Sequence, residues 1–180
     1  MPYPASGLPN DMFTSDARGL RRLRTDQGQT GFFENREFRF EWEISEPIVF
    51  KFSSPVNFIL QLQTFASHNG EAVFAAYAST QGSVGDPFGD VIPPNPNNAM
   101  TNAPEYTPKI VISRGGTFTP NDSDPNFARE YVKVIASTAT AQRSTVGGGG
   151  VKERGLPAGD YYLTFTGIDA SYRLIYEERP

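Results

Sequence analysis

The sequence contains no cysteine and only one histidine, His68. The lack of cysteine excludes disulfides and thiolate metal sites, and a single histidine excludes a cluster of histidine ligands. A serine–histidine–aspartate arrangement would depend on His68 alone. This residue precedes Asn69-Gly70, a turn signal, where a solvent-facing histidine is the ordinary outcome. We therefore expect a protein that is not an enzyme and that needs no cofactor.

Carboxylates are numerous, but their spacing does not indicate a catalytic pair or a metal site. Glu41 and Glu43 alternate along one segment, which is typical of the solvated face of a strand rather than of a glycosidase acid pair. The oxygen-rich segments 86–90 and 121–124 contain side chains of the kind that calcium prefers. Neither segment has EF-hand spacing, and such compositions are typical of turns. No metal site is predicted.

Long apolar runs and an excess of basic residues are also missing. No run approaches the roughly 18–20 residues of a membrane span. A net charge of −4 and a pI near 5.0 argue against general nucleic-acid binding, which normally requires a basic field. The N-terminus shows neither the basic nor the apolar region of a signal peptide. We expect synthesis in the cytosol and neither a membrane nor a nucleic acid as partner.

What the chain does contain is aromatic residues and turn formers, with 14 Phe, 8 Tyr, 17 Gly and 15 Pro in 180 residues. This length fits one domain and is enough to bury a substantial core. The aromatic residues supply that core, while glycine and proline indicate many turns without reaching the level of a disordered chain. The composition favours a sheet protein with long loops.

Residues 1–35 are predicted to form an extended N-terminal arm, because they are rich in proline and hold no sustained apolar period. The arm contains a basic cluster whose first three members could share one face of a short helix. This cluster consists of Arg18, Arg21, Arg22 and Arg24. It is interpreted either as a solvated basic turn or as a tether that docks on an acidic neighbouring subunit. In the second interpretation Phe32 and Phe33 belong to the same interface.

From residue 36 onward the pattern changes to that of strands. Phe38, Phe40, Trp42 and Ile44 alternate with charged residues, which predicts a half-buried strand with cross-strand ion pairs on its outer face. Asn69-Gly70 separates two further strand-like runs, which predicts a hairpin. Residues 80–108 form a long proline-rich connection that is either flexible or packs on the sheet or a neighbour.

About eight strands and no convincing helix are expected in residues 36–180. We therefore predict an all-β fold, an antiparallel two-sheet sandwich of jelly-roll type preceded by the extended arm. Tyr106 and Phe127 are predicted to lie in or near loops as exposed aromatics. They would either stack on sugar rings or anchor a subunit interface, where aromatic residues are enriched.

Short segments near both ends of the chain are similar to a known group of proteins. Near the N-terminus these are LRTD at 23–26, QTGFFE at 29–34 and REFR at 36–39. Near the C-terminus they are ERG at 153–155, GDYY at 159–162 and EERP at 177–180. This pattern resembles small structural proteins of tailed bacteriophages, with looser matches at Phe52, 55–56, 59–60 and 106–108. The motifs are structural rather than catalytic.

The resemblance implies a virion component without turnover of a substrate, assembled in the host cytoplasm and located on the virion. A capsid decoration or cement protein is the favoured role, with a neck or tail component as the alternative. An arm that becomes ordered on a neighbouring subunit suits symmetric assembly. The expected partners are other copies of the chain, in a homo-oligomer and preferably a trimer, and the major capsid or other virion proteins. A carbohydrate- or receptor-binding sandwich is the second hypothesis, because sandwiches serve many functions.

Overall fold

The structure is a computed structural model, and it describes residues 13–15, 21–23, 30–100, 102–136 and 154–180. It divides into two units, residues 1–30 and 31–180. In the first unit β1 (Phe13–Ser15) and β2 (Arg21–Leu23) pair antiparallel. The expectation of an arm without regular structure is therefore wrong at this pair. Arg21 and Arg22 lie on a strand rather than on a helix, because backbone pairing between the two segments supplies their hydrogen bonds.

The second unit begins at Gly31, five residues before the start at residue 36 that the sequence predicted. The short helix α1 (Thr30–Phe33) leads into it, so Phe32 and Phe33 belong to the folded body. None of the helices in the described part of the chain is long and apolar enough to cross a bilayer.

Two large sheets form the second unit, and all their strand pairs are antiparallel. The six-stranded sheet has the order β12 (Glu130–Ala136), β6 (Gly70–Ala78), β14 (Gly159–Thr166), β4 (Ile48–Ser54), β10 (Val111–Arg114) and β8 (Asp90–Ile92). The five-stranded sheet has the order β13 (Arg154–Leu156), β5 (Asn57–Ser67), β15 (Ala170–Arg179), β3 (Glu37–Ile44) and β9 (Asn95–Pro96).

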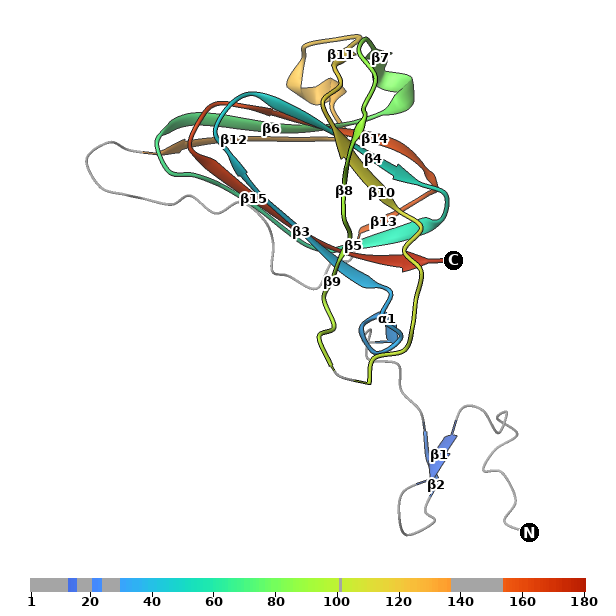
Figure 1. Ribbon diagram of the computed structural model, residues 1–180. Helices are drawn as coiled ribbons and strands as arrows, with labels where there is room; N and C mark the ends of the chain where they lie inside the picture. Colours follow the sequence, from blue (N-terminus) through green and yellow to red (C-terminus); the bar gives the residue numbers. More distant parts are fainter. Residues whose placement is uncertain (1–12, 16–20, 24–29, 101, 137–153) are drawn as a thin grey trace. The chain divides into compact units, whose positions relative to one another are not determined.

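The strand order is that of a jelly roll, as the sequence predicted (Figure 1). Strands β3, β4, β5 and β6 alternate between the two sheets along the chain. Next, β12 joins the edge beside β6, and β13 joins the edge beside β5. Finally β14 enters between β4 and β6, and β15 enters between β3 and β5. The last two long strands therefore complete both sheets at their centres.

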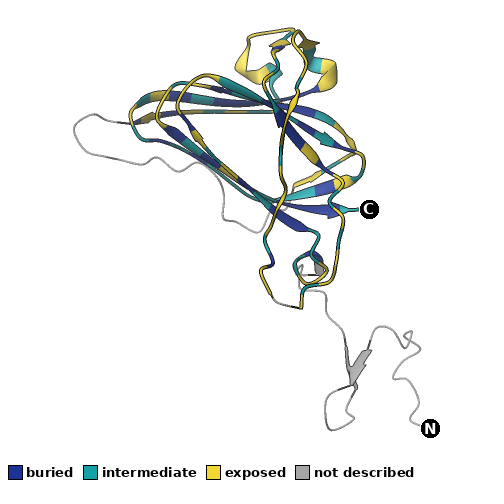
Figure 2. Cartoon of the chain, viewed as in Figure 1, coloured by how far each residue is buried: buried dark blue, intermediate teal, exposed yellow. Residues whose placement is uncertain are grey.

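Aromatic side chains fill the space between the sheets, and Figure 2 shows buried residues along the long strands of both sheets. The alternation predicted for β3 is confirmed, since Phe38, Phe40 and Ile44 are buried and Trp42 is half-buried. The ring of Phe50 lies 5.1 Å from that of Phe40, centroid to centroid. Edge-to-face pairs of this kind add about 0.5–1.5 kcal/mol beyond the burial of their area.

The outer face of β3 carries the cross-strand ion pair that its charge pattern predicted. Arg173 on β15 stands opposite Glu41 in the register, with Nε 2.8 Å from the carboxylate. Glu37, expected on the same solvated face, is buried instead. The reason is tertiary, because the side-chain amide of Asn97 covers Glu37 and donates a hydrogen bond to it.

The predicted hairpin around Asn69-Gly70 is wrong, because β5 and β6 belong to different sheets. Both strands turn aromatic residues toward the shared core, where the rings of Phe65 and Phe74 lie 6.0 Å apart. The turn therefore carries the chain across the core, with Gly70 at φ +69° and buried Ser67 donating to the Gly70 carbonyl at 3.0 Å. Burial of both inner faces decided against pairing within one sheet.

The connection between β6 and β12 is more structured than the sequence predicted. It contains the short strands β7 (Gly82–Val84), β8, β9, β10 and β11 (Phe118–Pro120), and two 3₁₀ turns. Strands β8 and β10 extend the six-stranded sheet, while β9 pairs with β3 of the other sheet. The chain passes from one sheet to the other through residues 93–94. Proline keeps these strands short but does not prevent edge pairing.

Candidate functional site

The sequence-predicted interface residues fall in two places. Arg18 and Arg24 lie outside the described residues, and for Arg21 and Arg22 the structure describes only the strand β2. Phe32 and Phe33 are in α1, with their rings nearly perpendicular and 5.4 Å apart. Phe33 is 54% exposed, so a large apolar ring faces solvent immediately after the first unit.

The segment that follows α1 is held by Arg36. Its Nη1 donates to the Glu178 carbonyl at 2.6 Å and lies 3.3 Å from the Glu177 carboxylate. Its Nη2 pairs with Glu34 at 2.6 Å. A half-buried guanidinium shared by these groups fixes the start of the folded body against the last strand, β15.

Glu178 is fully buried and binds part of the connection between β6 and β12, residues 79–129, which we call the insertion. Its carboxylate accepts hydrogen bonds from the Tyr106 hydroxyl at 2.8 Å, the Lys109 amide at 3.0 Å and the Ile110 amide at 2.8 Å. Charge-assisted bonds of this kind are about twice as strong as neutral ones. Glu178 therefore ties residues 106–110 to the C-terminal strand.

Tyr106 is half-buried rather than exposed. Its ring lies 6.2 Å from Phe38, and its hydroxyl is bound to Glu178. Burial, followed by the bond to Glu178, raises the pKa of Tyr106 to about 12. Tyr106 thus serves as part of the attachment of the insertion.

Glu177, on the opposite face of β15, is also fully buried. It accepts from Gln61 at 3.2 Å and pairs with Arg179 at 3.0 Å. Gly31 lies directly over it, since a Cβ at that position would come within 2.1 Å of the carboxylate. Burial raises the pKa of Glu177, while Arg179 and Arg36 oppose the shift. Close passage of Gly31 explains why the chain needs glycine there.

Phe127, the second predicted loop aromatic, is half-buried in a small cluster outside the sandwich. It packs with residues of the six-stranded sheet and of β11, where the rings of Phe118 and Tyr162 stack at 4.2 Å. The carbonyl of Phe127 also accepts a hydrogen bond from the Gln81 side chain. The insertion is thus anchored on the outer face of the six-stranded sheet.

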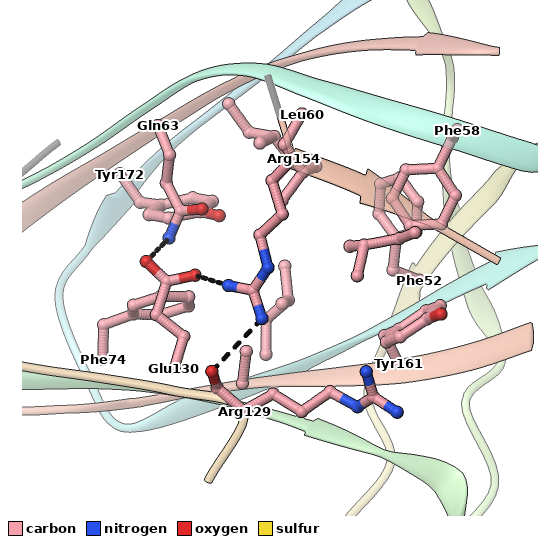
Figure 3. Close-up of a pocket in the computed structure, with 14 residues that line it drawn as sticks. Phe52, Phe58, Leu60, Gln63, Phe74, Arg129, Glu130, Arg154, Tyr161 and Tyr172 are labelled. Carbon is pink, nitrogen blue, oxygen red and sulfur yellow. Dashed lines mark hydrogen bonds and ion pairs between the residues drawn. The ribbon is translucent and has the colours of Figure 1, made fainter. Parts of the chain in front are cut away.

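An apolar pocket opens between the two sheets at the edges formed by β12 and β13 (Figure 3). About 40 Å³ of it is open to water-sized molecules, which corresponds to roughly three waters. The walls are aromatic and aliphatic, and include Phe52, Phe58, Leu60, Phe74, Tyr161 and Leu174. A space of this size suits one small apolar group and is too small for a sugar ring with its hydroxyls.

Polar side chains from both sheets meet at the pocket, as Figure 3 shows. Glu130 on β12 accepts from Gln63 at 3.0 Å and from Arg154 on β13 at 3.2 Å. Arg154 also donates to the Arg129 carbonyl at 3.3 Å. Burial raises the pKa of Glu130, against the lowering effects of Arg154 and Gln63. The network therefore links the two sheets where β12 and β13 form their edges.

A β-bulge explains why Gln63 reaches this network. In the pairing of β5 with β15, Tyr176 faces Leu60 but Ile175 faces Leu62, so Gln61 is an extra residue. Strict two-residue alternation predicts Phe58, Leu60 and Leu62 on one side of the strand. The bulge moves Leu62 to the opposite face and turns Gln63 inward.

The residues considered for catalysis and metal binding occupy ordinary structural positions. His68 is half-buried, with Nε2 3.1 Å from the Ser171 hydroxyl. Asp124 caps a 3₁₀ turn by accepting from the Asn126 amide, and Asp90 lies 3.8 Å from Arg114. Within the described ranges, no three carboxylate or histidine side chains are grouped to hold a metal ion.

No protein-family model, curated protein or solved structure was found to match this chain.

Sequence reasoning missed half-buried Arg36 and the buried carboxylates Glu177 and Glu178. One signal was present, because Tyr172, Leu174 and Tyr176 form the inward series of β15 and Glu178 continues it. A carboxylate at an inward position of a strand requires donors from elsewhere. The sequence did not show that the backbone amides of residues 109–110 would supply them.

Proposed function

We propose that this protein is a non-enzymatic structural component of a tailed-phage virion, a capsid decoration or cement protein that forms homo-oligomers. The arm that precedes the folded body contacts a neighbouring copy or the major capsid protein. Four arginines fall within residues 18–24, whereas the chain as a whole has a net charge of −4. The arginine cluster of the arm and the negative net charge of residues 36–180 favour an association between subunits.

The observation that carries the proposal is the rigid departure point of the arm. Arg36, with buried Glu177 and Glu178, fixes the body where the first unit leaves it. Phe33 exposes its ring at the same place. When the residues next to the arm are fixed by such contacts, less conformational entropy is lost as the arm binds another subunit. The exposed ring of Phe33 adds apolar surface for that contact.

The jelly roll adds support at the level of fold, since viral capsid proteins are among the proteins that use it. Fold alone does not define function, and lectins share this architecture. The proposal therefore depends on the arm and its base, and a trimer is the expected oligomer.

Light scattering on the purified full-length chain tests the assembly. We expect a mass three times the 19.8 kDa of one chain. Replacing Arg21, Arg22 and Arg24 by glutamine should shift the population to monomer, as should Phe33→Asp. The control changes the same number of charges on the sheets, at Arg39, Lys133 and Arg173.

Co-sedimentation with phage capsids, and separately with purified tails, tests the location. Binding to capsids supports the decoration role, and binding to tails alone would replace it with the neck or tail role. A protein that remains monomeric at all concentrations and binds neither particle would overturn the proposal.

A further inference from the structure

A groove lies on the outer face of the six-stranded sheet, away from the core and from the arm base. Its volume of about 690 Å³ falls within the range of about 300–1,000 Å³ that is typical of ligand sites. Four strands supply its floor. One wall comes from the insertion, through Gly116, Phe118 and Ser123, and the other from residues 46–47 at the β3–β4 turn.

The register explains why this face is hollow. Tyr131 on β12 pairs with Ala75 on β6, which pairs with Thr164 on β14. In the adjacent row Lys133, Val73 and Thr166 lie side by side. Ala75 is smaller than both of its neighbours in the first row, so the floor of the groove is lowest between Tyr131 and Thr164.

Hydroxyl groups line the groove, and Tyr131 is the exposed ring among its aromatic residues. Tyr131 is 39% exposed, and Thr166 and Ser123 are exposed as well. Tyr77 lies two residues from Ala75 on β6, so it is a diagonal neighbour of Tyr131 in the sheet. Burial, followed by the proximity of Tyr131, raises the pKa of Tyr77. At one end Arg114 and Asp90 pair with each other at 3.8 Å, which leaves Glu46 as the remaining charged group of the lining.

Strand pairing, a side-chain hydrogen bond and close backbone packing hold the residues that line the groove. Tyr131 is held within a seven-residue pairing of β12 with β6, and Thr164 donates to the Ala75 carbonyl at 3.1 Å. In the wall, a Cβ on Gly116 would lie 2.6 Å from the Asp86 carbonyl, so this backbone is closely packed. Sites on such elements lose little entropy when they bind a ligand.

We propose that this groove binds a neutral carbohydrate, a short oligosaccharide whose ring lies against Tyr131. Neutral hydroxyls suit a ligand rich in hydroxyls, and an aromatic face suits the apolar face of a sugar ring. A lipid would leave these hydroxyls unpaired, and a polyanion would meet Glu46 without a basic surround. The site is separate from the arm and does not depend on the assembly function.

A glycan array probed with the full-length protein, followed by calorimetry on the glycans that bind, tests the inference. Tyr131→Ala should weaken binding at least tenfold, which corresponds to about 1.4 kcal/mol. Thr166→Val keeps the shape but removes a hydroxyl, and should weaken binding severalfold. Tyr131→Phe should retain the stacking and most of the affinity.

Val91→Ala and Ile168→Ala are the controls, because both side chains are exposed and lie outside the groove. Thermal unfolding of each variant establishes that it is folded. An array without bound glycans overturns the inference. So does binding that is unchanged in Tyr131→Ala and Thr166→Val, or that is lost equally in the controls. None of these results bears on the oligomer measured by light scattering.

Discussion

The two long sides of the sandwich are closed in different ways. On one side the insertion adds β8, β9 and β10, and the chain itself crosses between the sheets at residues 93–94. On the other side β12 and β13 end the sheets, and Glu130, Gln63 and Arg154 meet over an apolar pocket. The comparison teaches that a short backbone link joins edge strands of the two sheets on one side, whereas on the other side the described edge strands are joined through side-chain contacts.

The two sides also use carboxylates differently. Glu178 is fully buried and accepts from backbone amides of the insertion, so its removal leaves donors without partners. Glu130 is half-buried and pairs with a side chain that can return to water. Loss of an acceptor costs most where the donors cannot be resolvated.

The largest expected effect follows removal of Glu178. Glu178→Ala should lower the free energy of unfolding by about 3–5 kcal/mol, because it leaves the Lys109 and Ile110 amides buried without an acceptor. Urea denaturation measures the loss. Glu178→Gln, which keeps one acceptor oxygen, should lose less. Glu105→Ala, an exposed change in the same segment, should stay within about 0.5 kcal/mol. A loss below about 1 kcal/mol for Glu178→Ala would contradict the proposed attachment.

A matched pair of substitutions compares the packing of the closed core with that of the pocket. Ala72 is buried in the core, and Ala76 lines the pocket on the same strand, β6. Ala72→Val should destabilise by about 1–3 kcal/mol through overpacking. Ala76→Val should instead stabilise by about 0.5 kcal/mol because it fills empty space. Thermal unfolding gives both values, and equal losses would show that the pocket has no room.

Removal of the Tyr106 hydroxyl should have a smaller effect than removal of Glu178. Tyr106→Phe keeps the ring against Phe38 but removes the bond to Glu178, and should cost about 1.5 kcal/mol. The pKa of Tyr106 is raised to about 12, so its contribution should be present below pH 10 and be lost as the pH rises toward 12. Stability measured from pH 8 to 11 should therefore fall less steeply in Tyr106→Phe. An identical slope in both proteins would contradict this assignment.

The smallest effect on stability is expected from substitution of Glu130, whose bonds to Gln63 and Arg154 join the two sheets. Burial raises the pKa of Glu130, so the folded protein holds this proton more tightly than the unfolded chain. Its contribution to stability is then fully present below its unfolded pKa and declines as the pH rises through the folded value. Glu130→Gln should flatten the stability profile above about pH 4.5, with a change below about 1 kcal/mol. Arg154→Lys is the control, because it preserves the charge opposite Glu130.

Parts of the site were accessible from sequence, and others were not. The charge alternation of β3 predicted cross-strand ion pairs on its outer face, and the structure supplies the partner, Arg173 opposite Glu41. The pocket network was not predictable, because Gln63 turns inward only through the bulge at Gln61. Tyr131 is exposed and Tyr106 is half-buried, because Tyr106 packs against Phe38 and its hydroxyl is bound to the distant Glu178.

The sequence by itself determined the fold class of this protein, an all-β sandwich. A two-residue period, abundant aromatics and regularly placed turns require two sheets packed on a common core, because each half-apolar strand must bury one face. Tertiary structure alone decided that Asn69-Gly70 crosses between the sheets and that the proline-rich insertion pairs with both of them. It also decided that Glu178 is satisfied by distant amides. These features depend on contacts between residues far apart in the chain, and local pattern carries no information about such pairing.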